Sequence, residues 1–443
     1  MAYTDTYREC IERIPDLIHE VKSKNKSPMF GFTSNLDVIL KWDEKKYNAI
    51  LKEFLDCTEP KADVGDLVYK MQDFARITAA YMARGLGGSF FIMDLAVCEY
   101  LRSHFDTEFY LGGTCAQGAA AFGRIGFPVN IHISDRCKEV CDLLSEDGIT
   151  SVKDGRKVPV AEICSGEPPI YHFILQFNRG DIIRIGDKEV VIPESNRLIF
   201  CYDQMQKDFP IDDGFFSYWE NGTECPTSVS ISGFDAILDA DIMDRHTDRI
   251  APLLRKIKER SPKTVIYFEG AFYMNAEMKD RILDTLGQYT DIIGMNEEEL
   301  KALLERKKLS VDLDSADEIM KALEMLLKLY RTKGIVLHTK DYSLYYGDDC
   351  NGYDIKSGLT MGNILSTTRA RISHYGNLEE CRETLGLELS KRGLALADAI
   401  ERIETKRRVE IVPSRYLSHP ACTIGLGDTF VAGVQTCFLT GGE

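Results

Sequence analysis

A glycine turn close to the end of the chain carries the residues best suited to chemistry. Gly425, Leu426, Gly427 and Asp428 precede the largely apolar segment 431–439, which is predicted to be a helix. Glycines let main-chain N–H groups approach a ligand, and the positive end of the helix dipole favours an anion there. An ionised Asp428 could take the proton from a hydroxyl that attacks a bound phosphoryl group. The turn therefore predicts a kinase site, while an ordinary strand-to-helix turn capped by Asp428 has the same pattern.

Two acidic residues follow predicted strands. Glu269 ends one apolar segment and Glu299 comes four residues after another. Open α/β sheets bind ligands at the carboxyl ends of their strands, and Mg²⁺ takes one or two carboxylates while keeping several waters. Glu269 and Glu299 are therefore candidate metal ligands. Asn296 and Glu299 also match a capping box, which requires no metal.

Small and polar residues in the first quarter of the chain could hold an acceptor. Asn35 and Asp37 stand two residues apart, so an extended segment would place both on one side, where they could bind vicinal hydroxyls. An Asx turn is the other interpretation of this pair. Gly112 and Gly113 open a small-residue helix, where either a ligand or a neighbouring helix could lie against the main chain.

Composition excludes several classes of partner. The chain has 443 residues, and 54 basic residues against 70 acidic ones give a net charge of −16. This charge repels nucleic acid and anionic membrane surfaces. There is no signal-peptide pattern and no apolar stretch of about 18 residues that would span a membrane. The 13 cysteines contain no Cys-x-x-Cys pair, so we expect reduced thiols and a cytoplasmic protein.

Alternating short apolar segments and amphipathic helices predict an α/β fold built from parallel βαβ units. One helix is expected from about Thr247 to Arg260, and the helix 276–286 is expected to begin at Asn275 as its cap. Two regions break this alternation: 40–110 is rich in helical patterns, and 170–200 alternates like antiparallel strands. We interpret both as insertions that form a second lobe. The predicted strands of the main part are 29–32, 129–133, 228–231, 264–268, 292–295 and 334–338.

Taken in order, these blocks resemble the ADP-dependent sugar kinases of the ribokinase-like superfamily over nearly the whole chain. The blocks that carry the resemblance are 31–37, Gly112-Gly113, 172–177, Ser195 to Ile199, 296–299 and Pro413 through Thr429. The resemblance implies a mostly parallel central sheet flanked by helices, with a smaller α+β lid domain inserted. The large nucleotide-binding domain would comprise 1–37, 111–165 and 200–443, and the lid over the sugar site 38–110 and 166–199.

The resemblance also implies roles for individual residues. The catalytic group would be Asp428 as base, Arg197 and the amides of Gly425 and Gly427. The sugar would be bound by Asn35, Asp37, Gly112, Gly113 and His172. The nucleotide, expected to be ADP, would contact Thr339, Gly425, Leu426 and Gly427, with the adenine near the helix start expected around Gly362 and Asn363. The Mg²⁺ ion would be held by Glu269, Glu299 and Asp428.

The sequence departs from the family pattern at three places. Tyr267 stands where the family has the histidine of His-x-Glu, and Thr114 replaces the usual glutamine after the two glycines. The lid glutamate of glucose-using members would fall near Gly88 or Ser89, where no carboxylate stands. The acceptor therefore stays open between a hexose and a hexose phosphate such as fructose 6-phosphate. An ATP-dependent kinase with another acceptor and a non-catalytic sugar or nucleotide sensor are the alternatives.

Overall fold

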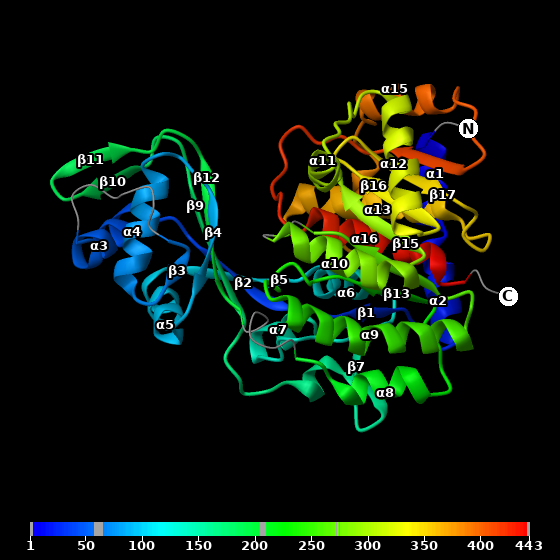
Figure 1. Ribbon diagram of the computed structural model, residues 1–443, viewed down its shortest axis with the longest axis horizontal. Coiled ribbons are helices and arrows are strands. Elements are labelled where there is room, and N and C mark those ends of the chain that lie inside the picture. Colours follow the sequence, from blue (N-terminus) through cyan, green and yellow to red (C-terminus); the bar gives the residue numbers. More distant parts are fainter. Residues whose placement is uncertain (1–2, 57–64, 204–209, 272, 274, 441–443) are drawn as a thin grey trace. The chain divides into compact units, whose positions relative to one another are not determined.

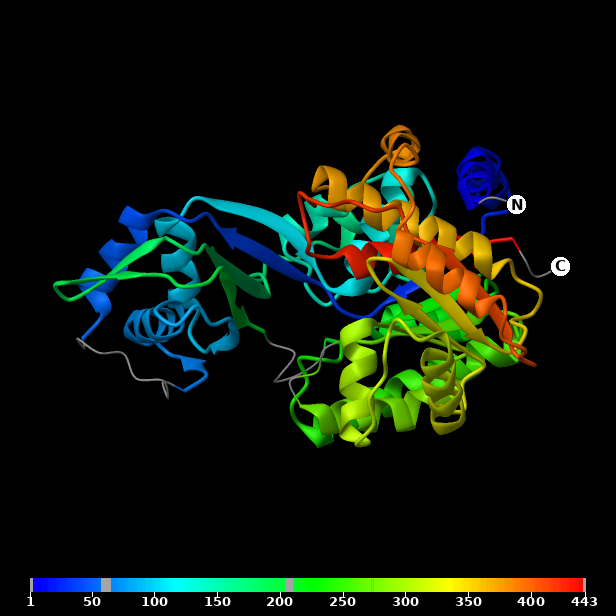
Figure 2. The ribbon, with the colours of Figure 1, turned by 90° about the horizontal axis from the view of Figure 1, so that it is seen from above.

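The computed structural model describes residues 3–56, 65–203, 210–271, 273 and 275–440. The chain divides into two compact units, the larger made of 1–34, 113–165 and 208–443 and the smaller of 35–112 and 166–207. The sequence predicted that the chain passes between the two domains after residues 37, 110, 165 and 199. In the structure it passes between the two units after residues 34, 112, 165 and 207. The first and last described elements, the helices at Tyr3 and Thr436, both belong to the larger unit (Figure 2).

A ten-stranded sheet forms the centre of the larger unit (Figure 1). Its order is β18-β17-β16-β15-β14-β13-β1-β6-β7-β8, and the seven strands from β16 to β7 pair in parallel. The outer strands β17, β18 and β8 are antiparallel. The strands are β1 (Met29–Gly31), β6 (Val129–Ile131), β7 (Ile149–Lys153), β8 (Arg156–Pro159), β13 (Ser228–Ile231), β14 (Val265–Glu269), β15 (Ile292–Asn296), β16 (Gly334–His338), β17 (Tyr342–Gly347) and β18 (Arg408–Pro413).

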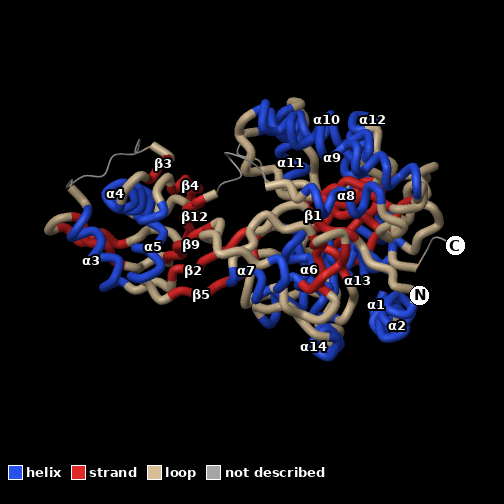
Figure 3. The backbone as a smooth tube through the Cα atoms, turned by 90° about the horizontal axis from the view of Figure 1, so that it is seen from below, coloured by secondary structure: helices blue, strands red, loops and turns tan. Residues whose placement is uncertain are grey.

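Helices cover both faces of this sheet (Figure 3). Both faces of the parallel strands are therefore buried, which explains why these strands are continuous apolar runs. The predicted α/β class with a mostly parallel central sheet is confirmed. The α-helices of the larger unit are α1 (Tyr3–Glu12), α2 (Ile14–Ser23), α6 (Thr114–Ile125), α7 (Lys138–Leu143), α8 (Asp213–Asn221), α9 (Ala240–Arg260), α10 (Ala276–Leu286), α11 (Glu297–Arg306), α12 (Ala316–Tyr330), α13 (Ile355–Ile372), α14 (Leu378–Thr384), α15 (Lys391–Ile400) and α16 (Leu426–Gln435); η1 (Val160–Ile163), η3 (Gly287–Tyr289) and η4 (Thr436–Phe438) are short 3-10 turns.

Side-chain caps fix where the helices near the proposed chemistry begin. The Asn275 side chain accepts a hydrogen bond from the Glu277 N–H, so α10 begins where the sequence predicted. Asn296 and Glu299 form the capping box of α11, with both reciprocal bonds present. The capping interpretation of these two residues is therefore correct, and the carboxylate of Glu299 is held at the end of β15.

Helices α13 and α16 pack against each other at backbone distance. A Cβ on Gly433 would lie 2.3 Å from the main-chain nitrogen of Gly362, so neither helix could approach as closely with a larger residue there. The two helices run in opposite directions, because Gly358 contacts Val434 whereas Arg369 reaches Thr429. This packing brings the end of α13 to the start of α16.

The smaller unit contains a six-stranded mixed sheet of order β3-β4-β12-β9-β2-β5 and the separate hairpin β10-β11. The pair β9-β12 is antiparallel as expected, whereas β2 pairs with β9 in parallel. Region 40–110 holds strands as well as helices, and the segment 88–92, which follows Gly85 and Gly87, is an inner strand. The elements are β2 (Asn35–Leu40), α3 (Glu44–Phe54), β3 (Leu67–Val68), α4 (Met71–Met82), β4 (Gly88–Ile92), α5 (Leu95–His104), β5 (Thr107–Gly112), β9 (Tyr171–Phe177), β10 (Ile182–Ile185), β11 (Lys188–Val191) and β12 (Asn196–Tyr202).

Within the described part of the chain, every helix is too short or too polar to cross a bilayer.

Candidate active site

Asp428 lies in the first turn of α16 and is tied to α6. The Gln117 amide donates from Nε2 to Asp428 Oδ2 at 2.7 Å. Burial raises the pKa of Asp428 above its ordinary value, while a hydrogen bond from Thr114 and the positive charge of Arg369 act in the opposite direction. A carboxylate with a raised pKa accepts a proton more readily than an ordinary aspartate, which suits a general base.

The glycine turn presents main-chain donors beside this carboxylate. Gly425 adopts a φ of +69° as the cap residue of α16, a conformation that L side chains rarely adopt. The N–H groups of Leu426, Gly427 and Asp428 precede the first intrahelical donor, the Thr429 N–H that bonds to the Gly425 carbonyl, and they bond to none of the described residues. Together with the helix dipole they form an anion site next to Asp428.

Arg369 is a buried cation at the same turn that the sequence did not indicate. It comes from the last turn of α13 and is 3% exposed. Its Nη1 donates to Thr429 Oγ1 at 3.2 Å, and its guanidinium lies 4.5 Å from the centre of the Tyr375 ring. A positive charge is thus fixed beside the first turn of α16, where it adds to the electrostatic attraction for an anion.

Glu269 and Glu299 lie together at the carboxyl ends of β14 and β15. Burial and the nearby charge of Glu269 raise the pKa of Glu299 to about 7. Two glycines leave room for these carboxylates. A Cβ on Gly270 would lie 2.8 Å from Glu299 Oε2, and a Cβ on Gly294 would lie 2.0 Å from Glu269 Oε2. The two carboxylates therefore form a buried acidic pair at the edge of the sheet that was predicted to bind ligands.

His338 at the end of β16 links this acidic pair to the glycine turn. Its Nε2 lies 2.8 Å from Glu269 Oε1, and its ring stacks on Phe430 of α16. Burial alone would lower the pKa of His338, but the Glu269 carboxylate outweighs burial and raises it. The His338 Cε1 would be 3.1 Å from a Cβ on Gly427, so the imidazole packs directly under the anion site.

The three predicted metal ligands, Glu269, Glu299 and Asp428, are not grouped in one cluster of the described structure, and their role stays a prediction. Among the residues that the structure describes, no three His, Cys, Asp or Glu side chains are grouped closely enough to hold one ion. The reason is geometric: Asp428 is turned toward α6, whereas Glu269 and Glu299 occupy the ends of β14 and β15. Glu269 Oε2 and the Tyr267 hydroxyl are buried and interact with each other, and a carboxylate oxygen has two lone pairs, so the acidic pair has capacity for a cation or its waters.

A cavity of about 360 Å³ lies beside the start of α16. Thr339 and Leu426, two of the predicted nucleotide contacts, line it. The Thr339 hydroxyl donates to the Tyr342 carbonyl and accepts from two main-chain N–H groups, so it closes the turn between β16 and β17. Asn363 also lines the cavity but lies in the middle of α13, so the prediction of a helix start at 362–363 is wrong.

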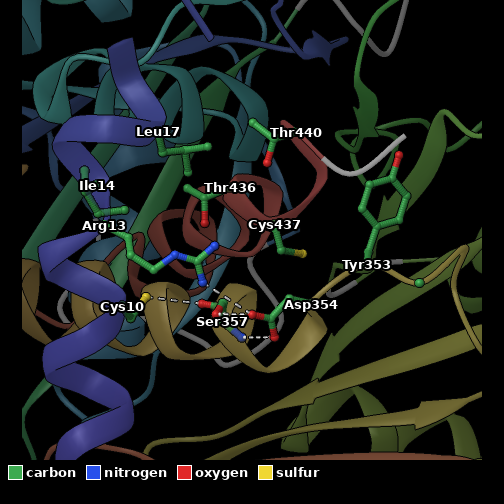
Figure 4. A pocket seen from close by; sticks show the side chains of 11 residues that line it. Cys10, Arg13, Ile14, Leu17, Tyr353, Asp354, Ser357, Thr436, Cys437 and Thr440 are labelled. Carbon is green, nitrogen blue, oxygen red and sulfur yellow. Dashed lines mark hydrogen bonds and ion pairs between the residues drawn. The ribbon is translucent and has the colours of Figure 1, made fainter. Parts of the chain in front are cut away.

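A second cavity of the larger unit, of about 220 Å³, lies at the beginning of α13 (Figure 4). Arg13 points toward Asp354 there, with 3.8 Å between Nη1 and Oδ2. Cys10 donates to the carbonyl of Ser357 at 3.6 Å. None of the predicted site residues lines this cavity, so it is separate from the glycine turn.

The smaller unit holds its own polar cluster on β2 and β9. Asn35 donates from Nδ2 to Asp37 Oδ1 at 2.7 Å, so the extended conformation places both side chains on one side as predicted. Asp37 faces His172 across the two strands, with 3.8 Å between Oδ1 and Nδ1. Gly112 pairs with Asn35, and a Cβ there would lie 2.0 Å from the Asn35 amide. Gly112 therefore makes room for this side chain.

His172 is the ionisable centre of that cluster. Its Nε2 lies 3.3 Å from Asp203 Oδ2. Burial would lower the pKa of His172, but its contacts with Cys201 and the Asp203 carboxylate outweigh burial and raise the pKa well above the ordinary value. Arg197 on β12 is exposed and pairs in register with Gln176. Its predicted contact with a transferring phosphoryl group stays a prediction.

Comparison with known proteins then decides the family. The conserved region of the ADP-specific phosphofructokinase/glucokinase family matches residues 26–435. The chain belongs to this family. An ADP-dependent glucose/glucosamine kinase of Pyrococcus furiosus is 22% identical over 455 residues, covering 97% of this chain and 96% of that protein. An ADP-specific phosphofructokinase of Thermococcus litoralis is 21% identical over 443 residues, covering 93% and 95%.

A solved structure has the same fold as this family member. It is an ADP-dependent kinase in complex with fructose-6-phosphate and ADPbetaS, with a TM-score of 0.72, 16% identity and 98% coverage of both chains. The resemblance inferred from the sequence is therefore correct at the level of family and fold. The relatives include both glucose and fructose-6-phosphate enzymes, so membership alone does not select the acceptor.

Three residues around Asp428 were not predicted in this ADP-specific phosphofructokinase/glucokinase family member: Gln117, Arg369 and Tyr375. Gln117 had a weak signal, because it is the one polar residue in a run of small and apolar residues from 115 to 122. Arg369 and Tyr375 had none, because only the packing of α13 on α16 brings them to Gly425.

Proposed function

We propose that the protein transfers the β-phosphoryl group of ADP to a hydroxyl of a hexose or hexose phosphate. The observation that carries this proposal is the position of Asp428, a carboxylate with a raised pKa that lies beside unbonded main-chain N–H groups at the start of α16. An anion site and a proton acceptor in one turn are the two parts that this reaction requires. Family membership supports the same reaction class.

In the proposed reaction the acceptor hydroxyl attacks the β-phosphorus. A new O–P bond forms, the P–O bond to the α-phosphate breaks, and AMP leaves. Asp428 takes the hydroxyl proton. The N–H groups of Leu426 and Gly427, with Arg369 behind them, stabilise the negative charge on the transferring group. Gly427 has no side chain, which lets the phosphoryl group approach the main chain above His338.

The residues present fit a divalent cation. Glu269 Oε2 is buried beside the Tyr267 hydroxyl, and burial together with the charge of Glu269 raises the pKa of Glu299, so a bound cation would stabilise the ionised form of both carboxylates. Mg²⁺ would be held by Glu269 and Glu299, partly through water because no third carboxylate joins them. When bound, it would supply charge neutralisation at the phosphates. His338 orients Glu269 for this role.

Each ligand has a proposed place of its own. The cavity lined by Thr339 and Leu426 suits a nucleotide, since it opens beside the anion site of α16. On the smaller unit, Asn35, Asp37 and His172 offer donors and acceptors for sugar hydroxyls. The role of Arg197 as a contact of the transferring phosphoryl group, and that of Gly113 as a sugar contact, belong to the same proposal.

The test is a panel of donors against acceptors. ADP, ATP and GDP would each be supplied with Mg²⁺ to purified protein together with glucose, glucosamine or fructose 6-phosphate. We expect AMP and a phosphorylated sugar to form in equal amounts with ADP. Preference for ATP would overturn the donor assignment, and binding of sugar or nucleotide without turnover would favour the sensor.

A further inference from the structure

Gln117 connects the Asp428 side chain to Tyr375 and to the surroundings of Arg369. It lies one turn into α6 and is 4% exposed. Its Nε2 is 2.7 Å from Asp428 Oδ2, a short distance for an amide bound to an ionised carboxylate. Thr114, three residues earlier on the same helix, also bonds to the Asp428 side chain. Thr114 and Gln117, which are three residues apart and lie on one face of α6, therefore both contact the Asp428 carboxylate.

The other end of the Gln117 amide is fixed as well. The Tyr375 hydroxyl donates to Gln117 Oε1 at 3.5 Å. Gln117 Oε1 also faces Gly425, because a Cβ on Gly425 would lie 2.0 Å from it. The same Cβ would lie 2.7 Å from Arg369 Nη2. A carboxylate only accepts and a phenol proton is donated, so the NH₂ group must face Asp428 and the oxygen must face Tyr375 and Arg369.

Arg369 holds this arrangement from α13. It donates to Thr429 in α16 and packs over the ring of Tyr375. The amide of Gln117 is thus enclosed by groups from α13, α16 and the loop that follows α13. Because the Gln117 amide is already fixed, it loses little conformational freedom when Asp428 accepts a proton. Such preorganisation of the groups around a base favours catalysis.

We propose that Gln117 is a positioning residue that holds the Asp428 carboxylate in the orientation required to accept the proton of the attacking hydroxyl. The amide is suited to this task because it donates a hydrogen bond but does not ionise, so it cannot compete for the proton. Tyr375 and Arg369 set the direction in which the amide points. This inference rests on the proposed function, in which Asp428 is the base.

The test compares Gln117→Met, which keeps the length of the side chain and removes the donor, with Gln435→Met as a matched control. Gln435 is also a buried glutamine, at the end of α16, and its amide has no partner among described residues. We expect Gln117→Met to lower kcat by about tenfold to a hundredfold, the scale of a small displacement of a catalytic group. KM for ADP and for the sugar should stay within about twofold, and Gln435→Met should leave kcat unchanged.

A double mutant separates positioning from a structural role. In the Asp428→Asn background, Gln117→Met should cause no further loss, because the group that it positions is already disabled. Equal additional losses in both backgrounds would contradict the inference. Tyr375→Phe should lower kcat by a smaller factor, about twofold to fivefold, and provides the test if Gln117→Met does not fold.

Two failures can be told apart. If Asp428→Asn abolishes turnover but Gln117→Met and Tyr375→Phe retain the wild-type kcat, the positioning role is wrong and the proposed function stands. If Asp428→Asn retains the wild-type kcat, the proposed function itself is wrong.

Discussion

The two units fix their polar groups in different ways. In the larger unit, Asp428 is held by Gln117 of α6, and Arg369 of α13 lies beside it, so three helices determine one carboxylate. In the smaller unit, Asn35, Asp37 and His172 sit on two neighbouring strands of one sheet. Under the proposed function, the two units have different tasks. Groups fixed from several elements suit proton transfer, and groups on a strand pair suit binding of sugar hydroxyls.

Gly425→Ala should break the larger unit's arrangement most severely. The new Cβ would meet Gln117 Oε1 at 2.0 Å in a residue with φ of +69°, so the turn and the amide must both move. We expect kcat to fall by about a hundredfold. Gly155→Ala is the matched control, because Gly155 has a similar φ of +73° and no atom within 4 Å of a new Cβ. Similar kcat losses in the two variants would show that backbone strain, not displacement of Gln117, is responsible.

Asp37→Asn should affect the acceptor and leave the donor unchanged. The charge that faces His172 and accepts from Asn35 would be lost. A hydrogen bond to a charged group contributes about 1.5 to 3 kcal/mol, so kcat/KM for the sugar should fall by about tenfold to a hundredfold. KM for ADP should not change. Asp106→Asn, an exposed acid of the same unit paired with Lys46, should have no effect. An increased KM for ADP in Asp37→Asn would contradict the proposal that this cluster binds the sugar and not the nucleotide.

His132 makes the larger unit sensitive to acid. Burial lowers its pKa to about 4, and Nδ1 lies 2.9 Å from the Phe32 carbonyl while Nε2 accepts from the Asp212 N–H. In the unfolded chain, His132 binds a proton below its ordinary pKa of about 6.5. In the folded protein, His132 stays neutral until the pH falls to about 4. Stability is therefore lost as pH falls from about 6.5 to 4, by at most about 1.4 kcal/mol per pH unit.

His132→Gln checks this pH dependence. Glutamine can donate and accept hydrogen bonds at this position but does not titrate. The free energy of unfolding, measured by denaturant between pH 7 and pH 4, should fall less steeply in the variant than in the wild type. Parallel curves would show that His132 is not the group responsible.

Gln435→Met should have the smallest effect, a modest gain in stability. Both polar atoms of Gln435 are buried without a partner among described residues, and an apolar side chain of similar length removes that cost. The melting temperature should equal or exceed that of the wild type. A lower melting temperature would show that the amide has partners, such as bound water.

Much of the larger unit was predictable because its elements have local signals. Strands β13 and β16 have the bounds that apolar runs predicted, and α10 begins at its predicted cap. The helix expected to start at Thr247 instead starts at Ala240, because Asp239 caps it earlier. In the smaller unit, β4 was missed since its glycine-rich start has no strand signal, and only pairing with β12 makes it extended.

The site was predictable in part, for a related reason. Asp428, Glu269 and Glu299 follow strands or glycine turns and so carry a local pattern. The bond from Gln117 to Asp428 spans 311 positions, and the contact of His338 with Glu269 spans 69. Such contacts depend on strand order and helix packing, which one sequence does not specify. Asp428 is turned toward α6 in the structure, and its role as a metal ligand stays a prediction.

The most direct test of the account is turnover and ADP binding by Asp428→Asn under identical conditions. We expect kcat to fall by at least about a hundredfold, the scale of lost general-base catalysis, while the Kd for ADP measured by calorimetry stays within about threefold. Turnover at the wild-type rate would contradict the assignment of Asp428 as the base.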